Sequence, residues 1–463
     1  MTISDESAVE LLRAMVEASS PCGEEDRVAA IILDAMGAAG FEAHRDEVGN
    51  VVGEIGSGDH ILMVLGHMDT APGIVPVNRR GNRLYGRGTV DAKGPLAAGI
   101  VAAARAAGKS RARLVVIGAV QEEGPSIGAR HLAQDEPPDL LIIGEPSNWD
   151  AVTLGYKGSQ RFESKFTCPS AHTGSPEPTT PELAVAFWQR LVEWCASFVP
   201  NATREFDRLT PKLISMTSDN DGLFSTASLH LGLRLPPGVG LEEVREGVAD
   251  LAAELVNQRV VGAGGTRPSA SRRARPVSPD QNVSTRAAVR RGVLHTSAPP
   301  WEDVTHPRNA PDDDHGTCPT TGDATDGVLG GRMQYPPTTA KIEDATPSGE
   351  TVGATGAAAT GDIARDVFDV TIDFAPGEPA VRVERRGPLV SAFLRAIRAE
   401  GGEPRFKVKT GTSDWNVVAS RWHCPAVAYG PGNSSLDHTP IENIELDEYL
   451  RGIRVLTHVM EEV

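Results

Sequence analysis

Short, continuous apolar runs alternate along the chain with segments whose apolar positions recur at helical spacing. Three of the runs, at 61–69, 113–123 and 139–146, are apolar on both faces. Buried parallel strands require this pattern, because helices cover both sides of their sheet. Between the first two runs, residues 95–108 predict a helix that begins with a proline and ends with a glycine. The alternation predicts an α/β domain with a doubly wound sheet.

The same patterns predict the other elements and a second domain. After Gly158 the pattern changes, which predicts a small α+β domain inserted into the α/β domain. Helices are expected at 7–18, 24–39, 181–199, 241–257, 388–400 and about 446–461. Strands are expected at 159–168, about 211–216, 227–235, 366–374 and 425–430, and a pair of edge strands at 48–56.

One long stretch, from about 262 to 362, shows neither helical nor strand periodicity. Glycine and proline, which number 48 and 34 in the chain, are concentrated there, and the few apolar residues are isolated. Such a composition buries too little apolar surface to fold, so the stretch is predicted to be a long disordered loop. The alternative is an arm that regulates the protein or binds a partner.

Composition and charge exclude several classes of protein. The 463 residues suffice for two or three domains, and a hydrophobic content of 40% excludes a wholly disordered chain. The net charge of -17 argues against general binding to nucleic acid or to an anionic membrane. No apolar run approaches the ~18 residues of a membrane span, and the acidic N-terminus predicts no secretion signal. The five scattered cysteines fit a reducing cytoplasm better than a disulfide framework.

Titratable residues gather where the predicted buried strands end. In open α/β sheets, ligands bind in the crevice beyond the carboxyl ends of the strands. Histidines and carboxylates brought together there would repel one another and lack solvation unless a cation joined them. The residues concerned are His67, Asp69, Asp91, Glu122, Glu123, Glu145 and His438.

These side chains offer only nitrogen and oxygen ligands, which suits Zn²⁺ or a similar divalent first-row metal. They outnumber the ligands of one tetrahedral metal, and a metal pair that shares a bridging carboxylate accounts for the number. Each motif alone has a plainer explanation: a core histidine, a solvated Glu-Glu pair or a simple turn. Their occurrence at successive strand ends favours a two-metal hydrolytic site.

Seven motifs in sequential order resemble the M20 family of dizinc amidohydrolases and peptidases. They are GHMDTAPG, YGRGTVDAKGPLAA, VQEEGPSIGAR, GEPS, SAHTGS, KTGTSDWNVVA and GPGNSSLDHTPIE. The resemblance covers the chain except the stretch at about 262–362. Three segments are most similar in sequence to the LysK group: GEPSNWDAVTLGYKGSQRF, LGLRLPPG and KTGTSDWN. Enzymes of that group release lysine or ornithine from an amino-group carrier protein.

The resemblance implies a role for each residue of the site and a cofactor of two Zn²⁺ per subunit, with Co²⁺ as a substitute. His67 and Glu145 would hold one zinc, Glu123 and His438 the other, and Asp91 would bridge the two. Asp69, two residues after His67, would orient its imidazole. Glu122, beside a ligand but not itself needed as one, would be the general base.

Further residues follow from the resemblance. His172 in SAHTGS would reach the active site of the second subunit of a homodimer and stabilise the oxyanion. Arg234 would pair with the α-carboxylate of the substrate, and Thr412 and Ser413 would hydrogen-bond to it. The implied organisation is a catalytic domain at 1–155 and 386–463, with a dimerisation (lid) domain at 156–385.

Two features stand apart from these roles. Lys157 and Arg161 could draw an acidic carrier towards a net-negative enzyme, but a solvated face is the favoured interpretation. The stretch at about 262–362 falls between a helix and a strand of the dimerisation domain, and we expect it to loop out without disturbing that domain.

Three functions remain open from the sequence. The leading one is a cytoplasmic dizinc amidohydrolase that releases lysine or ornithine from the C-terminal glutamate of an amino-group carrier protein, in lysine or arginine biosynthesis. The second is a deacylase of small N-acyl amino acids, such as N-acetylornithine, N-acetyl-lysine or a succinylated diamino acid. The third is an inactive metal-binding scaffold, which Glu122 argues against because a structural zinc site needs no unligated base.

Overall fold

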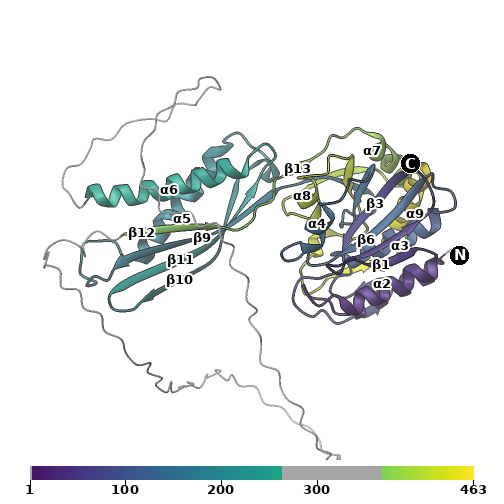
Figure 1. Cartoon of the computed structure of the whole chain (residues 1–463), viewed down its shortest axis with the longest axis horizontal. Helices are drawn as coiled ribbons and strands as arrows, with labels where there is room; N and C mark the ends of the chain where they lie inside the picture. Colours follow the sequence, from purple (N-terminus) through teal and green to yellow (C-terminus); the bar gives the residue numbers. More distant parts are fainter. Residues whose placement is uncertain (1–2, 263–367) are drawn as a thin grey trace, which may run out of the picture. The chain divides into compact units, whose positions relative to one another are not determined.

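A nine-stranded mixed sheet organises the larger part of the protein (Figure 1). The structure, a computed structural model, describes residues 3–262 and 368–463. The predicted disordered stretch at about 262–362 therefore lies almost wholly outside the described residues. Within those residues, the strand order of the sheet is β1-β2-β6-β3-β7-β15-β8-β13, and β14 pairs with β8. Its strands are β1 (Glu42–Arg45), β2 (Val51–Ile55), β3 (His60–His67), β6 (Ala112–Ala119), β7 (Leu140–Ile143), β8 (Ala151–Tyr156), β13 (Val381–Arg382), β14 (Arg405–Lys409) and β15 (Ala426–Ala428).

The centre of this sheet is parallel and its margins are not. β6, β3, β7 and β15 run parallel to one another, whereas β2 pairs antiparallel with β6, and β8 antiparallel with β15. The α/β organisation predicted from the apolar runs is confirmed, because the runs at 61–69, 113–123 and 139–146 supply the parallel strands β3, β6 and β7. The expected pair of edge strands at 48–56 is wrong: that segment supplies one strand, β2, and β1 forms the edge.

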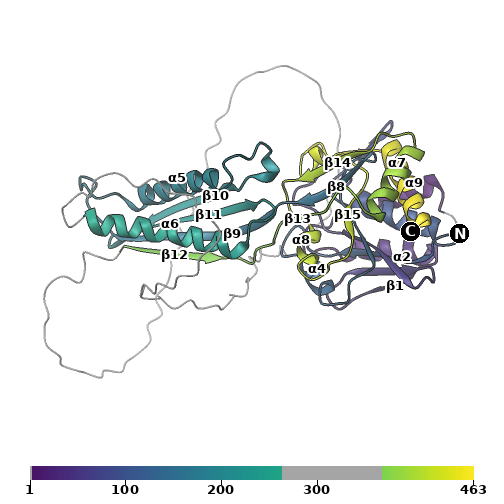
Figure 2. The same cartoon turned by 90° about the horizontal axis from the view of Figure 1, so that it is seen from above.

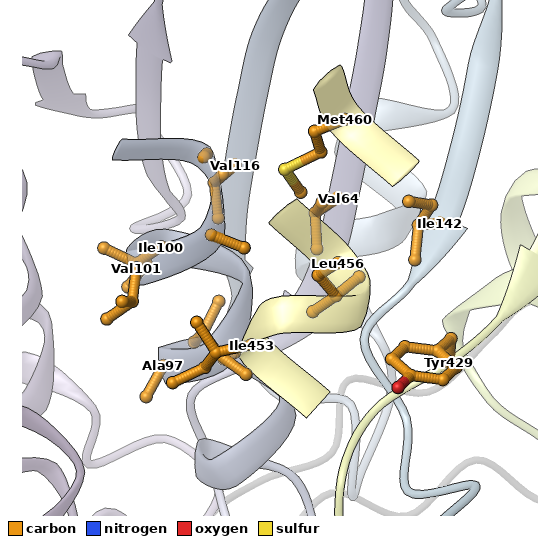
Figure 3. Packing of buried hydrophobic residues seen from close by; sticks show 14 of the residues in the cluster. Val64, Ala97, Ile100, Val101, Val116, Ile142, Tyr429, Ile453, Leu456 and Met460 are labelled. Atoms are coloured by element: carbon orange, nitrogen blue, oxygen red, sulfur yellow. The ribbon is translucent and has the colours of Figure 1, made fainter. Parts of the chain in front are cut away.

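Helices cover both faces of the sheet, as a doubly wound arrangement requires. Along β3, Val64 faces a layer that contains α3 and α9, whereas the next residue, Leu65, packs with α4 and α8 on the opposite face. Figure 3 shows Val64 and Ile142 pointing towards Leu456 and Met460 of α9. The helices around this sheet are α1 (Asp5–Glu17), α2 (Asp26–Ala39), α3 (Lys93–Ala106), α4 (Ile127–Leu132), α7 (Pro388–Ala399), α8 (Asp414–Val418) and α9 (Leu446–Glu462).

A separate four-stranded antiparallel sheet, in the order β10-β11-β9-β12, has its own core. Alternate residues of β9 are buried, and Phe162 and Phe166 pack with Phe187 of α5 and Val248 of α6. One face of this sheet is therefore covered by α5 and α6 (Figure 1, Figure 2). Its elements are β9 (Gly158–Pro169), α5 (Thr180–Phe198), β10 (Thr210–Asn220), β11 (Phe224–Leu235), α6 (Leu241–Gly262) and β12 (Asp369–Phe374).

A small three-stranded sheet completes the described structure. β16 (Asn443–Glu445), β5 (Arg83–Tyr85) and β4 (Asn78–Arg80) pair antiparallel beside the glycine-rich turn that leads to α3. Each has three residues, too few for a periodic pattern to predict. The described residues all belong to one compact unit. None of the helices in those residues has the length and apolar composition of a membrane-spanning segment.

Candidate metal centre

The predicted metal ligands converge at the carboxyl end of the parallel strands. His67 is the last residue of β3, and Glu145 lies two residues beyond β7. Glu123 follows β6 through a turn in which Gln121 adopts a left-handed conformation with φ 59°. His438 also has φ 59°, in the loop after β15. Non-glycine residues in this region carry backbone strain, and such strain is concentrated at functional sites.

Asp91 joins two groups of candidate ligands. One group is His67, Asp91 and Glu145, and the other is Asp91, Glu123 and His438; in each, the ligand atoms lie within 4.8 Å of one another. The Asp91 Oδ1 atom lies 3.2 Å from His67 Nε2, and its Oδ2 atom lies 3.0 Å from His438 Nε2. One carboxylate thus turns an oxygen towards each group, the geometry expected of a bridging ligand.

Asp69 contacts both His67 and the turn that carries Glu122 and Glu123. Its backbone oxygen lies 3.0 Å from His67 Nδ1, which leaves Nε2 of that ring facing Asp91 and Glu145. Its carboxylate accepts the backbone N–H groups of Glu122 and Glu123 at 3.0 and 2.9 Å. The Asp69 carboxylate also lies 3.4 Å from His67 Nδ1, and it fixes the turn that carries the two glutamates; its role in orienting the imidazole stays a prediction.

Glu122 belongs to neither group of candidate ligands. Its Oε2 atom lies 3.9 Å from His67 Nε2, so it is close to the centre without joining it. Burial, with the neighbouring charges of Asp414, Glu145 and Asp91, raises the pKa of Glu122 well above its ordinary value. A buried carboxyl with a raised pKa beside the ligands is suited to accept and return a proton.

The two histidines balance part of the negative charge in the metal-free protein. Hydrogen bonds that the imidazole of His438 donates to Asp91 and Glu123 raise its pKa to about 10. Burial opposes protonation of His67, but nearby carboxylates, Glu122 foremost, outweigh it and raise its pKa. Burial likewise opposes ionisation of Asp91, yet hydrogen bonds from both histidines hold its pKa well below the usual range. Burial raises the pKa of Glu145 instead, so in the metal-free protein the charges at the centre are only partly balanced.

The donor set fits a pair of zinc ions. Two imidazoles and three carboxylates supply only nitrogen and oxygen, and the carboxylates are largely buried, at 10 to 13% side-chain exposure. Excess buried carboxylate is unfavourable without a cation, and a shared carboxylate between two ligand groups suits a two-metal site. The metal roles of these residues stay predictions.

Two polar residues near the centre were not singled out from the sequence. Glu442 is fully buried and accepts the N–H of Asp91 at 3.2 Å. Lys409 ends β14, and its Nζ atom lies 3.4 Å from Glu145 Oε2. Lys409 is the first residue of the KTGTSDWNVVA motif, but the cations that alternate along β14 are typical of a solvated strand. Only the pairing of β14 with β8 brings its last residue to the site.

The predicted substrate-binding residues lie together. Arg234, at the end of β11, donates from Nη1 to Thr412 Oγ1 at 3.1 Å. Its charge acts on Glu122, and burial lowers the pKa of its guanidinium. Ser413 caps α8, and its backbone N–H donates to Asn416 Oδ1 at 2.9 Å. The structure thus brings Arg234 and Thr412 together near the base, while their contact with a substrate stays a prediction.

His172 is not brought to the centre within this chain. Its Nδ1 atom accepts the N–H of Gly174 at 3.1 Å in an exposed loop. Among the described residues it makes no hydrogen bond or ion pair with the candidate ligands. Its predicted role, in the active site of a second subunit, stays a prediction.

The favoured interpretation of Lys157 as part of a solvated face is wrong. Lys157 is fully buried, and its Nζ atom donates to the backbone oxygens of Glu205 and Arg208 and to Thr210 Oγ1, at 3.1, 2.6 and 2.8 Å. Three acceptors satisfy the three donors of the ammonium, which allows its burial. Arg161 is exposed, as expected.

Comparisons with known proteins agree with the motifs. The profile of "Peptidase family M20/M25/M40" matches residues 63–462. The "[LysW]-lysine hydrolase" of Deinococcus radiodurans is 34% identical over 462 residues, which cover 98% of this chain and 96% of that protein. Among solved structures, a tripeptidase from Staphylococcus aureus aligns with a TM-score of 0.64 at 13% identity, covering 100% of this chain and 99% of that one. The M20 family metallo-carboxypeptidase Sso-CP2 from Sulfolobus solfataricus has a TM-score of 0.59 at 15% identity, covering 98% of each chain.

Proposed function

The chain belongs to peptidase family M20/M25/M40, and on that premise we propose that it is a dizinc amidohydrolase that releases lysine or ornithine from an amino-group carrier protein. The observation that carries the hydrolase assignment is the pair of ligand groups that share Asp91, with Glu122 beside them and outside both. A structural metal site would have no use for that unligated carboxyl.

The two groups of candidate ligands correspond to the two zinc ions. His67 and Glu145 would hold one zinc, Glu123 and His438 the other, and Asp91 both. Bound there, the metals supply Lewis acidity, which polarises an amide carbonyl and lowers the pKa of a water molecule. Asp69 keeps the imidazole of His67 and the turn at 122–123 in place while the reaction proceeds.

Glu122 moves the proton in this mechanism. Its carboxylate takes a proton from the attacking water and returns it to the leaving amine, which departs as the free amino group of lysine or ornithine. Its position beside both ligand groups and outside them leaves this carboxylate available to carry the proton. Arg234 pairs with the α-carboxylate of the released amino acid, and Thr412 and Ser413 hydrogen-bond beside it.

The substrate assignment rests on similarity along the whole chain. The relative from Deinococcus radiodurans is named for hydrolysis of a lysine-bearing carrier, LysW, and the match spans nearly the full length of both proteins. The metal centre alone does not separate a carrier-linked substrate from an N-acetyl amino acid, because the amide chemistry is the same.

A homodimer would complete the site. β10 is an edge strand of the four-stranded sheet, and Ile214 and Met216 on it are 60% and 39% exposed. Long edge strands with exposed apolar side chains pair readily with another strand. The loop that carries His172 is tied to the β10–β11 turn, because the Ser170 N–H donates to the Leu223 oxygen at 2.8 Å. We assign residues 156–385 to the dimerisation domain, and residues 1–155 and 386–463 to the catalytic domain.

The test measures metal content and amine release on the same purified protein. Carrier-linked lysine, carrier-linked ornithine, N-acetyl-lysine and N-acetylornithine are offered in parallel. Two zinc ions per subunit with turnover of a carrier-linked substrate alone would support the proposal. Comparable turnover of the free acetyl compounds would reassign the protein to the small-molecule deacylases, and zinc binding without turnover of any substrate would favour the scaffold.

A further inference from the structure

Lys409 places a cation at the edge of the metal centre. Its Nζ atom lies 3.4 Å from Glu145 Oε2 and 5.6 Å from the centre of the Tyr156 ring, and its side chain is 15% exposed. Its charge also acts on Asp91 and lowers the pKa of that carboxyl. Lys409 therefore faces the centre and remains within reach of a ligand.

The hydrogen-bonding capacity of this ammonium is largely unused. An ammonium carries three donors, and across the residues that the structure describes Glu145 is the one acceptor paired with Lys409 Nζ. Lys157 offers a contrast, because its three donors meet three protein acceptors. Lys409 contacts Oε2 of Glu145, whereas Oε1 lies 3.6 Å from His67 Nε2, so this one contact leaves two of the three donors available. Lys409 is thus suited to bind an anion of the substrate.

The proposed substrate carries two carboxylates, and the site offers two cations. A C-terminal glutamate has two carboxyl groups; one forms the amide that is cleaved, and the other remains an anion. The released amino acid contributes the second anion through its α-carboxylate, which Arg234 is proposed to bind. Arg234 and Lys409 flank the loop at 410–413, since Lys409 precedes it and Arg234 Nη1 bonds to Thr412 within it.

We propose that Lys409 binds the free carboxylate of the carrier's C-terminal glutamate and so selects a glutamyl amide over an acetyl amide. This inference rests on the proposed function, because only a glutamyl substrate brings that carboxylate. An acyl group that lacks the carboxylate leaves two donors of the ammonium without an acceptor in a largely buried site, and this penalty disfavours the acetyl amide.

Two synthetic substrates isolate this carboxylate. The two carboxyl groups of glutamate are the ends of one five-carbon chain, so Nα-glutaryl-lysine reproduces either linkage to lysine. Nα-pentanoyl-lysine has the same chain length without the second carboxylate. The readout is the ratio of kcat/KM for the glutaryl substrate to kcat/KM for the pentanoyl substrate, with the zinc content of every variant measured alongside.

We expect Lys409→Met, and Lys409→Gln as a second variant, to lower that ratio by about 10- to 100-fold, the loss typical of a hydrogen bond to a charged group. Lys409→Arg should restore part of it. Lys407→Met is the matched control, because Lys407 lies two residues earlier on the same strand and bonds to Asn148 rather than to a candidate ligand; its ratio should equal that of the wild type. Equal losses on both substrates in the Lys409 variants would overturn the proposal.

A binding measurement separates this proposal from the proposed function. Glutarate is titrated calorimetrically into the zinc-loaded wild type and the Lys409 variants, and its Kd should rise at least about tenfold in Lys409→Met. If the wild type hydrolyses carrier-linked lysine but neither acyl-lysine, the glutarate measurement alone decides the role of Lys409. If it hydrolyses none of the three substrates, the proposed function fails, and the glutarate measurement still decides the role of Lys409. A Kd unchanged by Lys409→Met would refute that role.

Discussion

The carboxylate of Glu442 accepts the backbone N–H of Asp91 at 3.2 Å, across 351 positions of sequence. The same oxygen accepts the N–H groups of Gly88 and Val90 at 2.9 and 3.0 Å, and the other oxygen pairs with Arg87 Nη1 at 2.8 Å. Glu442 therefore fixes the whole turn that carries the proposed bridging ligand. Partners of this kind hold a ligand in the orientation that a metal requires.

Glu442→Gln should weaken zinc binding by about 10- to 100-fold, because the amide has one acceptor oxygen and turns its NH2 donors towards either the N–H groups of the turn or Arg87. The measurement is competition for zinc against a chelator of known affinity. Glu445→Gln is the control, since Glu445 lies on the neighbouring strand β16 and pairs with Arg83 in an exposed ion pair. Equal zinc affinity in both variants would show that Glu442 does not position Asp91.

Glu122→Gln should leave the zinc content close to that of the wild type and lower kcat by at least about 100-fold, because the amide cannot carry the proton. Glu123→Gln should instead lose zinc, since Glu123 lies in a ligand group and Glu122 does not. Zinc analysis and steady-state kinetics on both variants check this division. Loss of metal from the Glu122 variant would mean that the two roles are exchanged.

The ligands were predictable because they follow apolar runs. His67 and Glu145 end or follow buried strands, and the carboxyl ends of such strands meet at one edge of the sheet. Glu123 ends the apolar run at 113–123 and His438 follows the strand predicted at 425–430, whereas the division of these ligands between two metals follows from the resemblance. No local pattern placed these residues within 4.8 Å of one another; the strand order did.

The residues around the ligands were less predictable. Glu442 and Lys409 act through contacts formed only when distant segments pair, and neither stands in a segment with a clear burial pattern. Lys157 was misjudged because an uncompensated lysine is almost never fully buried. Three acceptors from residues 205–210 compensate it, and a sequence does not reveal that such acceptors converge.

Removal of metal should destabilise the protein. Chelation leaves the carboxylates of Asp91, Glu123 and Glu145 facing one another, with the two histidines and Lys409 as the neighbouring cations. A ligand that binds the folded state stabilises it by mass action, so Tm should fall on treatment with a chelator and recover when zinc is added back. Asp91→Ala removes a ligand from both groups. The Tm of this variant should therefore not respond to zinc. An unchanged Tm after complete metal removal would contradict a zinc-supported fold.

Asp414 should make the stability of the metal-free protein depend on pH. Burial first, then the charges of Asp69 and Glu145, raises the pKa of Asp414 to about 7. The folded state therefore binds more protons than the unfolded state between about pH 4 and pH 7, so stability contributed by the neutral carboxyl is full below that window and lost as pH rises through it.

Asp414→Asn should abolish this loss of folding stability with rising pH. The free energy of unfolding of the chelated variant, relative to that of the chelated wild type, should increase by up to ~4 kcal/mol between about pH 4 and pH 7. Urea unfolding at several pH values within and above that window measures it. A difference between the two proteins that stays constant with pH would show that Asp414 ionises normally in the fold.

His172 should act in the active site of the other subunit, and mixing two inactive variants tests this directly. His172→Ala and Glu122→Gln should each lower kcat strongly, because one removes the oxyanion donor and the other the base. In a mixed dimer, the site with an intact Glu122 receives the intact His172 of its partner. Random exchange makes half of the dimers mixed, each with one complete site, so activity should recover to about a quarter of the wild-type value. If His172 instead served its own subunit, every site in the mixture would lack one group, and no activity would return.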